Sequence, residues 1–335
     1  MNKNKVLIIT FSNDNPCVGV VSDEIRKQGC EPVSFNTDLF PEKSTIEVSA
    51  LKGELVPFIT QGKQRTDLRQ LRSVWYRRSR IGESLRGQMA AAHMSPVLQE
   101  SQLMVSAAIH ALPVFQLDHY LLHRLMENKL YQLSVAQRCG LNIPPNLYTN
   151  SKQAFQQFYK SNKENVITKM FSSFAIYENN TEQVVFTTKL EKKHLKQMGG
   201  LQVSPMSFQK NIAKKRELRV TIVGKKVFTA AVDSQKLDTA KTDWRVEGAA
   251  LVTHWYPYQL PKDMERKLLK MMDMFQLNYG AIDIIETPRG EFYYLETNSG
   301  GEYFWLDHLF DHGISMAIAQ LLCGKEKGRQ MKLYK

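Results

Sequence analysis

Three side chains that can bind a metal ion stand close together near the C-terminal end of the chain. The stretch from Ala281 to Asn298 reads AIDIIETPRGEFYYLETN, which predicts two short strands joined at a Pro-Arg-Gly turn. Glu296 and Asn298 are two residues apart, so in a strand their side chains point to the same face. Pairing about the turn brings Asp283 level with Glu296. Two carboxylates and an amide oxygen on one face predict a Mg²⁺ site that also contacts substrate phosphates; alternatively, they are solvated side chains of a surface hairpin.

The composition is that of a globular protein with an excess of positive charge. Of the 335 residues, 43% are hydrophobic and 23% are charged, and 45 basic against 33 acidic residues give a net charge of +12. This charge favours an anionic partner. Because the basic residues form only short clusters, without a recognition helix, an RNP motif or a zinc finger, we expect no nucleic-acid partner.

The sequence also indicates where the protein works. No apolar run is long enough to span a bilayer, and the N-terminus lacks a signal-peptide layout, so we expect no membrane association. The four cysteines are scattered and form no CxxC pair, which predicts reduced thiols. We therefore expect a cytoplasmic protein.

The elements that must position the hairpin predict an α/β chain. A strand at 6–10, a helix at 18–29 and a strand at 32–35 make a βαβ start, as in doubly wound sheets. A strand at 71–77, a helix at 88–112 and a strand at 114–116 complete one α/β domain over residues 1–126.

Two further units are predicted after this domain. Residues 127–209 form a small α+β lobe whose first helix, 128–140, has Leu130, Leu133 and Ala136 on one side. Its other elements are a helix at 151–161, strands at 166–170, 175–177 and 183–187, and a helix at 191–197. Residues 210–335 alternate strands (217–223, 226–233, 280–285, 292–296) with helices (263–277, 314–322).

Two lysines are placed where they could contact a nucleotide. The chain has no GxxxxGK[ST], HRD, DFG or GxGxxG motif, which disfavours P-loop, kinase and dinucleotide-binding sites. Lys129 lies in the first turn of a helix, and Lys169 ends the apolar strand VITK. A lysine that emerges from a buried strand into a cleft suits phosphate, although each also fits a surface lysine whose stem covers apolar residues.

The order of these residues resembles that of the ATP-grasp ligases over nearly the whole chain. Lys129, Lys169, a strand at 206–211, the sequence ELR at 217–219, Asp283 and Glu296-x-Asn298 follow one another as in that family. The spacing of thirteen residues between Asp283 and Glu296 is similar to that of the metal carboxylates in the D-alanine–D-alanine ligase branch. The segments WYRR, ELRVTIVG, VFTAAVDSQ, DWR and GGEYFWLD narrow the resemblance to the microviridin-type peptide maturases, or graspetide synthetases.

The resemblance implies an ATP-grasp fold in which an N-terminal α/β domain precedes two α+β lobes that clasp ATP. Asp283, Glu296 and Asn298 would hold two Mg²⁺ ions, and Arg219 and Arg245 would face the γ-phosphate and the acyl phosphate formed from it. Residues that would bind ATP are Lys129 and Lys169 at the phosphates and, around adenine, the segment 205–211 with Gln209, Lys210, Asn211 and Ile212. Lys210 stands where an acidic residue is usual, and FSSF at 171–174 lacks the glycines of a phosphate-covering loop.

The resemblance also implies a peptide substrate. Graspetide synthetases join side-chain carboxylates of a ribosomal precursor peptide to its Ser/Thr hydroxyls or Lys amines. The leader part of the precursor would dock on the basic unit 181–196, with Phe186 and Leu190 as apolar anchors and Lys192 and Lys193 as charges. We expect a homodimer, and ester bonds in preference to amide bonds.

Alternatives remain open on the sequence. An ATP-grasp ligase that joins a small carboxylic acid to an amine is the second enzyme hypothesis, and a basic binding module without catalysis is the third. Trp75-Tyr76-Arg77-Arg78 fits either a core with salt bridges or a ligand site at a strand end. His308 and His312 have the spacing of a zinc pair, but with no third ligand in view a structural role is favoured.

Overall fold

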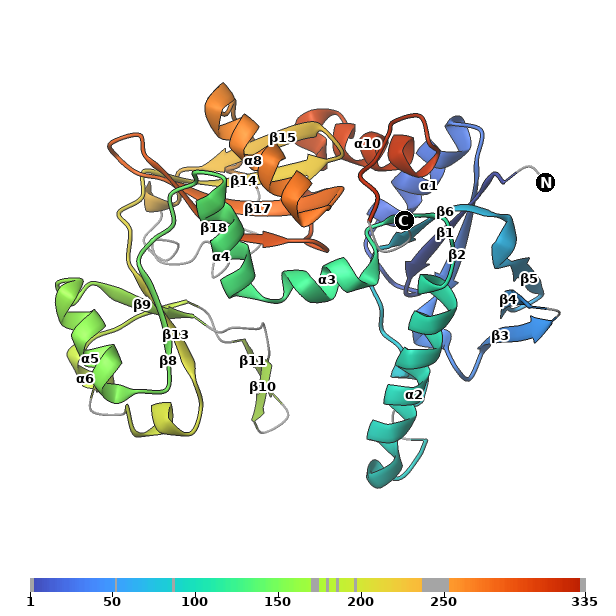
Figure 1. Ribbon diagram of the computed structural model, residues 1–335, viewed down its shortest axis with the longest axis horizontal. Coiled ribbons are helices and arrows are strands. Elements are labelled where there is room, and N and C mark those ends of the chain that lie inside the picture. Colours follow the sequence, from blue (N-terminus) through green and yellow to red (C-terminus); the bar gives the residue numbers. More distant parts are fainter. Residues whose placement is uncertain are drawn as a thin grey trace.

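The computed structural model describes residues 3–51, 53–85, 88–169, 175–178, 181–184, 187–195, 198–236 and 253–331. Figure 1 shows an N-terminal part at one end of the longest axis, a small lobe at the other end, and an antiparallel sheet with its helices between them. None of the helices within these residues is long and apolar enough to cross a membrane. The three predicted units, 1–126, 127–209 and 210–335, stay predictions.

A parallel sheet in the order β2-β1-β6-β7 forms the N-terminal part. The chain runs from β1 to β2 on one side and later to β6 on the other, so the winding reverses between β1 and β6. Val6 and Ile8 of β1 pack toward α1 and α10, whereas Leu7 and Ile9 pack toward α2. The strands are β1 (Lys5–Thr10), β2 (Glu31–Asn36), β6 (Leu71–Tyr76) and β7 (Phe115–Leu117), and the helices are α1 (Cys17–Lys27), α2 (Ala91–His110) and α3 (Tyr120–Met126).

A three-stranded antiparallel sheet beside α2 was missed by the sequence analysis. It consists of β3 (Ser44–Leu51), β4 (Glu54–Gln61) and β5 (Gln64–Asp67). Its turns contain Gly53 and Gly62, both in the left-handed region with φ of 82° and 60°, where glycine is favoured. Few of its side chains are buried, so the alternation of apolar and polar residues that would announce these strands is weak.

The small lobe contains an antiparallel sheet in the order β12-β9-β13-β8. The rings of Phe155 from α5 and Phe208 from β13 lie 4.4 Å apart between centroids and form its core. A separate hairpin pairs Ala175 with Val184, so its second strand begins earlier than the predicted 183–187. The elements are β8 (Asn146–Thr149), α5 (Lys152–Ser161), β9 (Val166–Lys169), β10 (Ala175–Glu178), β11 (Thr181–Val184), β12 (Thr188–Lys189), α6 (Lys192–Leu195) and β13 (Met206–Lys210).

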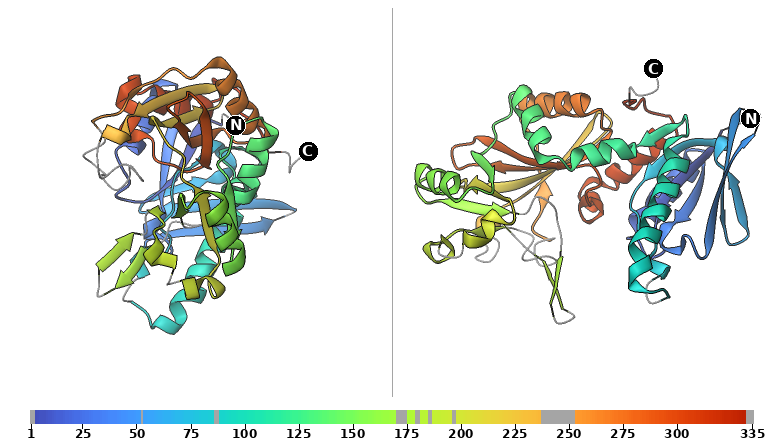
Figure 2. Two further views of the ribbon diagram at one scale, coloured as in Figure 1. Left: turned by 90° about the vertical axis from the view of Figure 1, so that its left-hand side faces the viewer. Right: turned by 60° about the horizontal axis from the view of Figure 1, so that its bottom comes forward.

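The antiparallel sheet between these parts has the order β16-β15-β14-β17-β18, with β18 at an edge. Leu218, Val220 and Ile222 alternate along β14 and pack in one hydrophobic cluster with α4 and α8. The other face turns toward α10 and the N-terminal part (Figure 2). The elements are α4 (Lys129–Arg138), β14 (Arg216–Val223), β15 (Lys226–Val232), β16 (Tyr256–Pro257), α8 (Lys262–Phe275), β17 (Tyr279–Glu286), β18 (Phe292–Asn298), α9 (Phe304–Asp307) and α10 (Gly313–Leu322).

The buried side of α4 differs from the predicted one. Leu130 was predicted to share the apolar side with Leu133 and Ala136, but 54% of it is exposed. The buried residues include Gln132 and Val135 instead. At about 100° per residue, their directions centre almost opposite Leu130. A polar residue, Gln132, therefore occupies the inward side, and the hydrophobic pattern alone did not indicate this.

Three histidines meet where α2 approaches α3. The rings of His110 and His119 lie 4.8 Å apart between centroids, and His123 Nδ1 lies 2.9 Å from Ser299 Oγ, just beyond β18. Burial and, to a smaller extent, the charges of His119 and His123 together lower the pKa of His110 to about 4. Burial also lowers the pKa of His123 to about 4. Both rings are therefore neutral in the folded protein near neutral pH.

We expect the free energy of unfolding to fall as the pH drops from about 6.5 to about 4, the unfolded and folded pKa values of His110 and His123. In this window the unfolded chain binds protons that the folded protein rejects, so stability is lost toward acid. The slope approaches about 1.4 kcal/mol per pH unit for each histidine. Urea unfolding across this range, for wild type, His123→Gln and the exposed control His93→Gln, checks it; an equal slope in wild type and His123→Gln would contradict the assignment.

Candidate active site

A β-bulge aims Glu296 into the candidate site. In the β17–β18 pair Asp283 lies opposite Glu296, but the next residue, Ile284, lies opposite Tyr294, so Leu295 is an extra residue in β18. Ile284 and Tyr294 are buried in the cluster under the sheet. Without the extra residue Glu296 would share that face with Tyr294. The bulge instead turns Glu296 to the face of Asp283, which is the re-aiming that bulges provide near functional sites.

The side-chain amide of Gln132 fixes the edge strand that carries the candidate metal ligands. Its Oε1 accepts from the Thr297 backbone N–H at 2.8 Å and from the Tyr294 hydroxyl at 2.9 Å, and its Nε2 donates to the Thr297 carbonyl at 2.9 Å. The amide thus pairs with Thr297 as a neighbouring strand would. Because Thr297 stands between Glu296 and Asn298, these bonds hold both side chains in register.

Each carboxylate of the pair has a cationic partner. Lys129, one helical turn before Gln132, places its Nζ 2.7 Å from Glu296 Oε2. Arg219 lies opposite Asp283 in the β14–β17 pair and donates from Nη1 to Asp283 Oδ1 at 2.7 Å. Burial lowers the pKa of the Arg219 guanidinium, but Asp283 and its other neighbours raise it by more, so the net pKa shift is upward and the group stays charged. Asp283, Glu296, Arg219 and Lys129 therefore form one compact charged group.

A loop after β18 passes close to this group. A side chain at Gly301 would come within 2.7 Å of Ala281 Cβ and 3.1 Å of Arg219 Nη2, so only glycine fits. The Gly301 carbonyl accepts from the Tyr279 hydroxyl at 2.6 Å. Arg219 Nη2 donates to the carbonyl of the next residue, Glu302, at 3.1 Å. Hydrogen bonds from Tyr279 and Arg219 therefore fix the backbone of this loop at Gly301 and Glu302.

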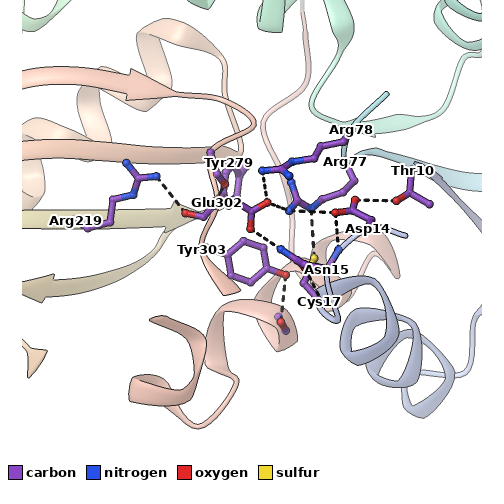
Figure 3. A network of polar contacts seen from close by, with 12 residues as sticks. Thr10, Asp14, Asn15, Cys17, Arg77, Arg78, Arg219, Tyr279, Glu302 and Tyr303 are labelled. Carbon is purple, nitrogen blue, oxygen red and sulfur yellow. Dashed lines mark hydrogen bonds and ion pairs between the residues drawn. The ribbon is translucent and has the colours of Figure 1, made fainter. Parts of the chain in front are cut away.

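The Glu302 side chain joins this loop to the N-terminal sheet (Figure 3). Its Oε1 forms ion pairs with Nη2 of both Arg77 and Arg78, which follow β6. Its Oε2 accepts from Asn15 Nδ2 at 2.6 Å in the loop after β1. Arg77 is further held by its Nε, 3.3 Å from Cys17 Sγ, and by the nearby Asp14 carboxylate. Trp75 is core and the arginines form salt bridges, as the first of the two interpretations of Trp75–Arg78 predicted, and a ligand site at this strand end stays a prediction.

The other residues predicted to bind ATP lie on two neighbouring strands of the small lobe and on the stretch that follows the second of them. Lys169 is half-buried at the end of β9 and lies opposite Ser207 of β13. Gln209 is buried and Lys210 is exposed at the end of β13. Asn211 and Ile212 follow, and Asn211 is held by reciprocal bonds with Asn165, including Asn165 Nδ2 to the Asn211 carbonyl at 3.1 Å. This stretch leads directly into β14 and Arg219.

The residues predicted for the leader lie apart from this site. Lys192 and Lys193 begin α6 on the small lobe, and Lys193 pairs with Glu191 at 2.8 Å. Leu190 is only 7% exposed and packs with Phe155 and Phe208 in the lobe core, so it faces inward rather than toward a peptide. Phe186, Arg245 and the segment 171–174 lie outside the described residues.

The donor set fits Mg²⁺. Among the described residues no three or more His, Cys, Asp or Glu side chains gather as a metal cluster, so a metal here would use two carboxylates and the Asn298 amide. Such hard oxygen ligands, few in number, suit Mg²⁺, which keeps several waters and binds phosphate oxygens. Two carboxylates facing each other across a strand pair also need positive charge to offset their repulsion.

His312, which has the spacing of a zinc pair with His308, contacts a carboxylate elsewhere in the chain: its Nδ1 lies 3.2 Å from Asp307 Oδ2.

Comparison with known proteins identifies the family. The chain matches the model of the MvdD pre-ATP grasp domain over residues 5–124. It is 36% identical, with a TM-score of 0.95, to a RiPP-associated ATP-grasp ligase from Chryseobacterium gregarium solved with ADP and a leader and core peptide, covering 98% of this chain and 99% of that one. This chain belongs to the RiPP-associated ATP-grasp ligases of the microviridin type. The predicted ATP-grasp fold and family are therefore confirmed.

Two macrocyclases from Microcystis aeruginosa MRC are also similar over almost their whole length. The macrocyclase MdnC, solved with the precursor peptide MdnA, is 39% identical with a TM-score of 0.87, covering 96% of this chain and 99% of that one. The macrocyclase MdnB is 28% identical with a TM-score of 0.77, covering 95% and 99%. None of the curated proteins matches the sequence.

The sequence analysis missed Gln132 and Glu302 in this ATP-grasp ligase. Gln132 carried a usable signal, because it lies three residues after Lys129 and hence on the same side of the helix. Glu302 was part of the quoted segment GGEYFWLD, and the two preceding glycines indicated a close backbone approach. Asn15 carried no signal, since its role depends on a partner 287 residues away.

We predict that Gln132→Ala destabilises the protein and loosens β18, the strand that carries Glu296 and Asn298. Removing the amide leaves the Thr297 N–H and carbonyl without their partner, while the Tyr294 hydroxyl keeps only Thr297 Oγ1. This costs about 1–3 kcal/mol in the free energy of unfolding. It should also raise the Mg²⁺ concentration needed for half-maximal nucleotide binding. The control Ser73→Ala removes one buried hydrogen bond, to the Leu322 carbonyl at 2.7 Å, and should leave the Mg²⁺ dependence alone. Equal Mg²⁺ dependence in Gln132→Ala and wild type would contradict the positioning role.

Proposed function

We propose that this ligase uses ATP and Mg²⁺ to activate Asp or Glu side-chain carboxylates of a ribosomal precursor peptide and joins them to Thr or Ser hydroxyls, or to Lys amines, so that macrocycles form. The observation that carries the proposal is the charged group of Asp283, Glu296, Arg219 and Lys129. Membership of the family supports the peptide substrate, since two similar enzymes were solved with a leader and core peptide and with a precursor peptide.

The residues that would hold the metal are Asp283, Glu296 and Asn298. Mg²⁺ held there would supply positive charge that offsets the charge of the transferring phosphoryl group. Lys129 and Arg219, which contact the two carboxylates, then lie beside the phosphates. Lys169 and the segment from Gln209 to Ile212 complete the ATP site, with the backbone of this segment beside adenine.

The reaction follows from the weakness of a carboxylate as an electrophile. An oxygen of the peptide carboxylate takes the γ-phosphoryl group and ADP leaves, so that an acyl phosphate forms. A hydroxyl or amine of the same peptide attacks the acyl carbon, loses its proton and expels phosphate. Arg219 and Arg245 would grip the phosphate oxygens in both steps, because guanidinium forks match phosphate geometry. Holding both groups of one peptide makes the attack nearly intramolecular.

An experiment on the peptide's mass tests the proposal. Incubation with ATP, Mg²⁺ and a precursor peptide encoded beside this gene should release ADP and remove one water per ring from the peptide. We propose ester rings on the resemblance to microviridin-type enzymes; mild alkali opens esters and spares amides, so it separates the two. A small-molecule product in place of a modified peptide would support the small-acid ligase instead. No ADP release with any acceptor would support a binding module.

We predict that Asp283→Ala, Glu296→Ala and Asn298→Ala each abolish ligation while the protein stays folded. Each substitution removes one oxygen ligand from the group that offsets phosphate charge. ADP release and circular dichroism are measured on the same samples. Glu291→Ala, on the exposed turn of the same hairpin, is the control and should keep wild-type turnover. Full turnover by Glu296→Ala at ordinary Mg²⁺ concentrations would overturn the metal assignment.

Replacement of Arg219 by lysine should lower the turnover by at least about tenfold, because the charge remains but the two-pronged geometry is lost. Arg216→Lys on the same strand is the control, since Arg216 pairs with Glu286 at 3.4 Å, away from Asp283. The comparison of kcat for the two variants decides between a role at the phosphate and a role in folding. A wild-type kcat in Arg219→Lys would make this arginine structural. Arg245→Lys is expected to behave like Arg219→Lys.

The leader of the precursor is proposed to dock on the unit 181–196, apart from the ATP site. A disordered peptide with several reacting carboxylates needs a separate anchor while its core visits the active site. Lys192 is exposed at the start of α6, and the β10–β11 hairpin projects from the same lobe (Figure 1). Since Leu190 is buried, the surface charges and Phe186 would make the contacts.

Charge reversal at Lys192 and Lys193 is predicted to weaken precursor binding more than turnover at saturating peptide. Calorimetry with a leader-only peptide measures the affinity, and ADP release at saturating precursor measures the turnover. Lys262 and Lys270 on α8, reversed together, are the control for a general change in net charge. An unchanged leader affinity in the variant with both α6 lysines reversed would place the dock elsewhere.

A homodimer completes the proposal. Apolar side chains on the N-terminal part support it, since Leu55 and Leu103 are 52% and 55% exposed and a cavity of about 660 Å³ lies between β4 and α2. Light scattering on the purified protein gives the mass in solution and so tests this expectation.

A further inference from the structure

The two arginines after β6 stand at the place where an open α/β sheet binds ligands. The order β2-β1-β6-β7 reverses its winding between β1 and β6, and ligands of such sheets bind outside the carboxyl ends of the strands at this switch point. The backbone N–H groups of Arg77 and Arg78 both donate to the Ile9 carbonyl, at 3.0 and 3.2 Å. Both side chains thus start from the crevice between the ends of β1 and β6.

A carboxylate of the protein itself occupies this place. Glu302 Oε1 lies between the guanidinium groups of Arg77 and Arg78, and Asn15 donates to its Oε2 (Figure 3). The two arginines differ in exposure, because the side chain of Arg77 is 4% exposed and that of Arg78 is 38% exposed. Arg77 is held from below by Cys17 and Asp14. The Arg77 side chain is therefore buried and held in place, whereas the Arg78 side chain is partly exposed to solvent.

This place lies beside the phosphoryl-transfer group. Arg219 donates with one Nη to Asp283 and with the other to the Glu302 carbonyl. The peptide carboxylate must meet the γ-phosphate within contact distance, and the γ-phosphate must lie at Asp283 and Glu296. Arg219 therefore contacts both Asp283 and the residue whose side chain Arg78 holds.

We infer that Arg78, supported by Arg77, binds the side-chain carboxylate of the peptide that is to be phosphorylated, and that Glu302 is an internal stand-in which this carboxylate displaces. The inference rests on the proposed function and names the subsite for its acceptor. The Glu302 backbone is fixed by Arg219, and the preceding Gly301 by Tyr279, so only the Glu302 side chain has to move. Its side chain is 28% exposed, which leaves it a path to solvent.

The energetics of the exchange favour a selective site. Because one carboxylate replaces another, the arginines keep a negative partner throughout and no buried guanidinium is left unpaired. A neutral Asn or Gln side chain cannot displace Glu302, since it offers the arginines no negative charge. The subsite therefore distinguishes acidic residues from their amides before any ATP is consumed.

Two synthetic peptides test the subsite by binding alone. One alternates threonine and aspartate, the other threonine and asparagine, and both have blocked ends. Calorimetry without ATP should show tighter binding of the aspartate peptide to wild type, and Arg78→Ala should reduce this preference by about tenfold or more, the loss expected for a charge-assisted hydrogen bond. Arg80→Ala, two residues further on and paired with Glu83 at 3.6 Å, is the matched control and should keep the preference.

The variant Glu302→Gln distinguishes a carboxylate that occupies the substrate's place from one that only joins the two parts of the protein, here called a latch. Without the competing charge, the aspartate peptide should bind Glu302→Gln several-fold more tightly than wild type, while binding of the asparagine peptide stays the same. A latch between the two parts of the protein would give weaker binding of both peptides. Unfolding of the variant by urea shows whether its fold is kept.

The outcomes distinguish this inference from the proposed function. Equal binding of the two peptides by wild type, or an unchanged preference in Arg78→Ala, overturns the subsite even if the protein cyclises its precursor. A preference that Arg78→Ala removes, together with no ADP release from wild type, keeps the subsite and overturns the ligase. When both hold, kcat/KM for the precursor should fall by about tenfold or more in Arg78→Ala, with ATP affinity unchanged.

Discussion

The hydrogen bonds between the Gln132 amide and Thr297 are the constraint on which the candidate active site depends. They close the exposed edge of β18, and they do so at the residue between Glu296 and Asn298. The same helix begins with Lys129, so one rigid element sets the edge strand and brings a cation to Glu296. The bulge at Leu295 then decides which face of the strand each side chain takes. Gln132, a polar residue on the inner side of α4, thus contacts β18 through hydrogen bonds instead of apolar packing. Because hydrogen bonds are directional, they allow only one register of β18.

Charge is balanced locally throughout the site, and this has a functional meaning. Arg219 faces Asp283, Lys129 faces Glu296, and Arg77 and Arg78 face Glu302. Each pair contains a group that the proposed reaction would need for another partner: a carboxylate for a metal, or a cation for a phosphate or a substrate. The folded protein thus avoids unpaired buried charge, and under the proposed function ligands would enter by exchange of partners. Such exchange costs less than stripping water from a bare ion, because the resident ion pair has already been desolvated.

Local patterns predicted the elements that carry the site but not how they come together. The two strands and their turn were predicted, and β17 and β18 confirm them, but Asp283 lies opposite Glu296 only because of the bulge at Leu295, which the two-residue period did not indicate. The face of α4 was wrong at Leu130 because the inward position belongs to Gln132, which no hydrophobic pattern favours. Leu190 was taken for a surface anchor, whereas the lobe core needs it. Glu302, Asn15 and Arg77 meet only through contacts between the ends of the chain, which have no local signature.

The distance along the chain between Asn15 and Glu302, 287 residues, has a consequence for how the protein folds during its synthesis. Contacts of such long separation close late in folding, since a large loop must be ordered first. During synthesis the N-terminal sheet emerges with its arginines long before Glu302 and α10, whose Ile314 and Ile318 cover the α1 side of β1. Until residues 292–322 have been synthesised, a nascent chain therefore has neither β18, with Glu296 and Asn298, nor α10 to cover this face of the sheet. The N-terminal sheet thus exposes both its apolar face and its arginines during most of the synthesis of this enzyme.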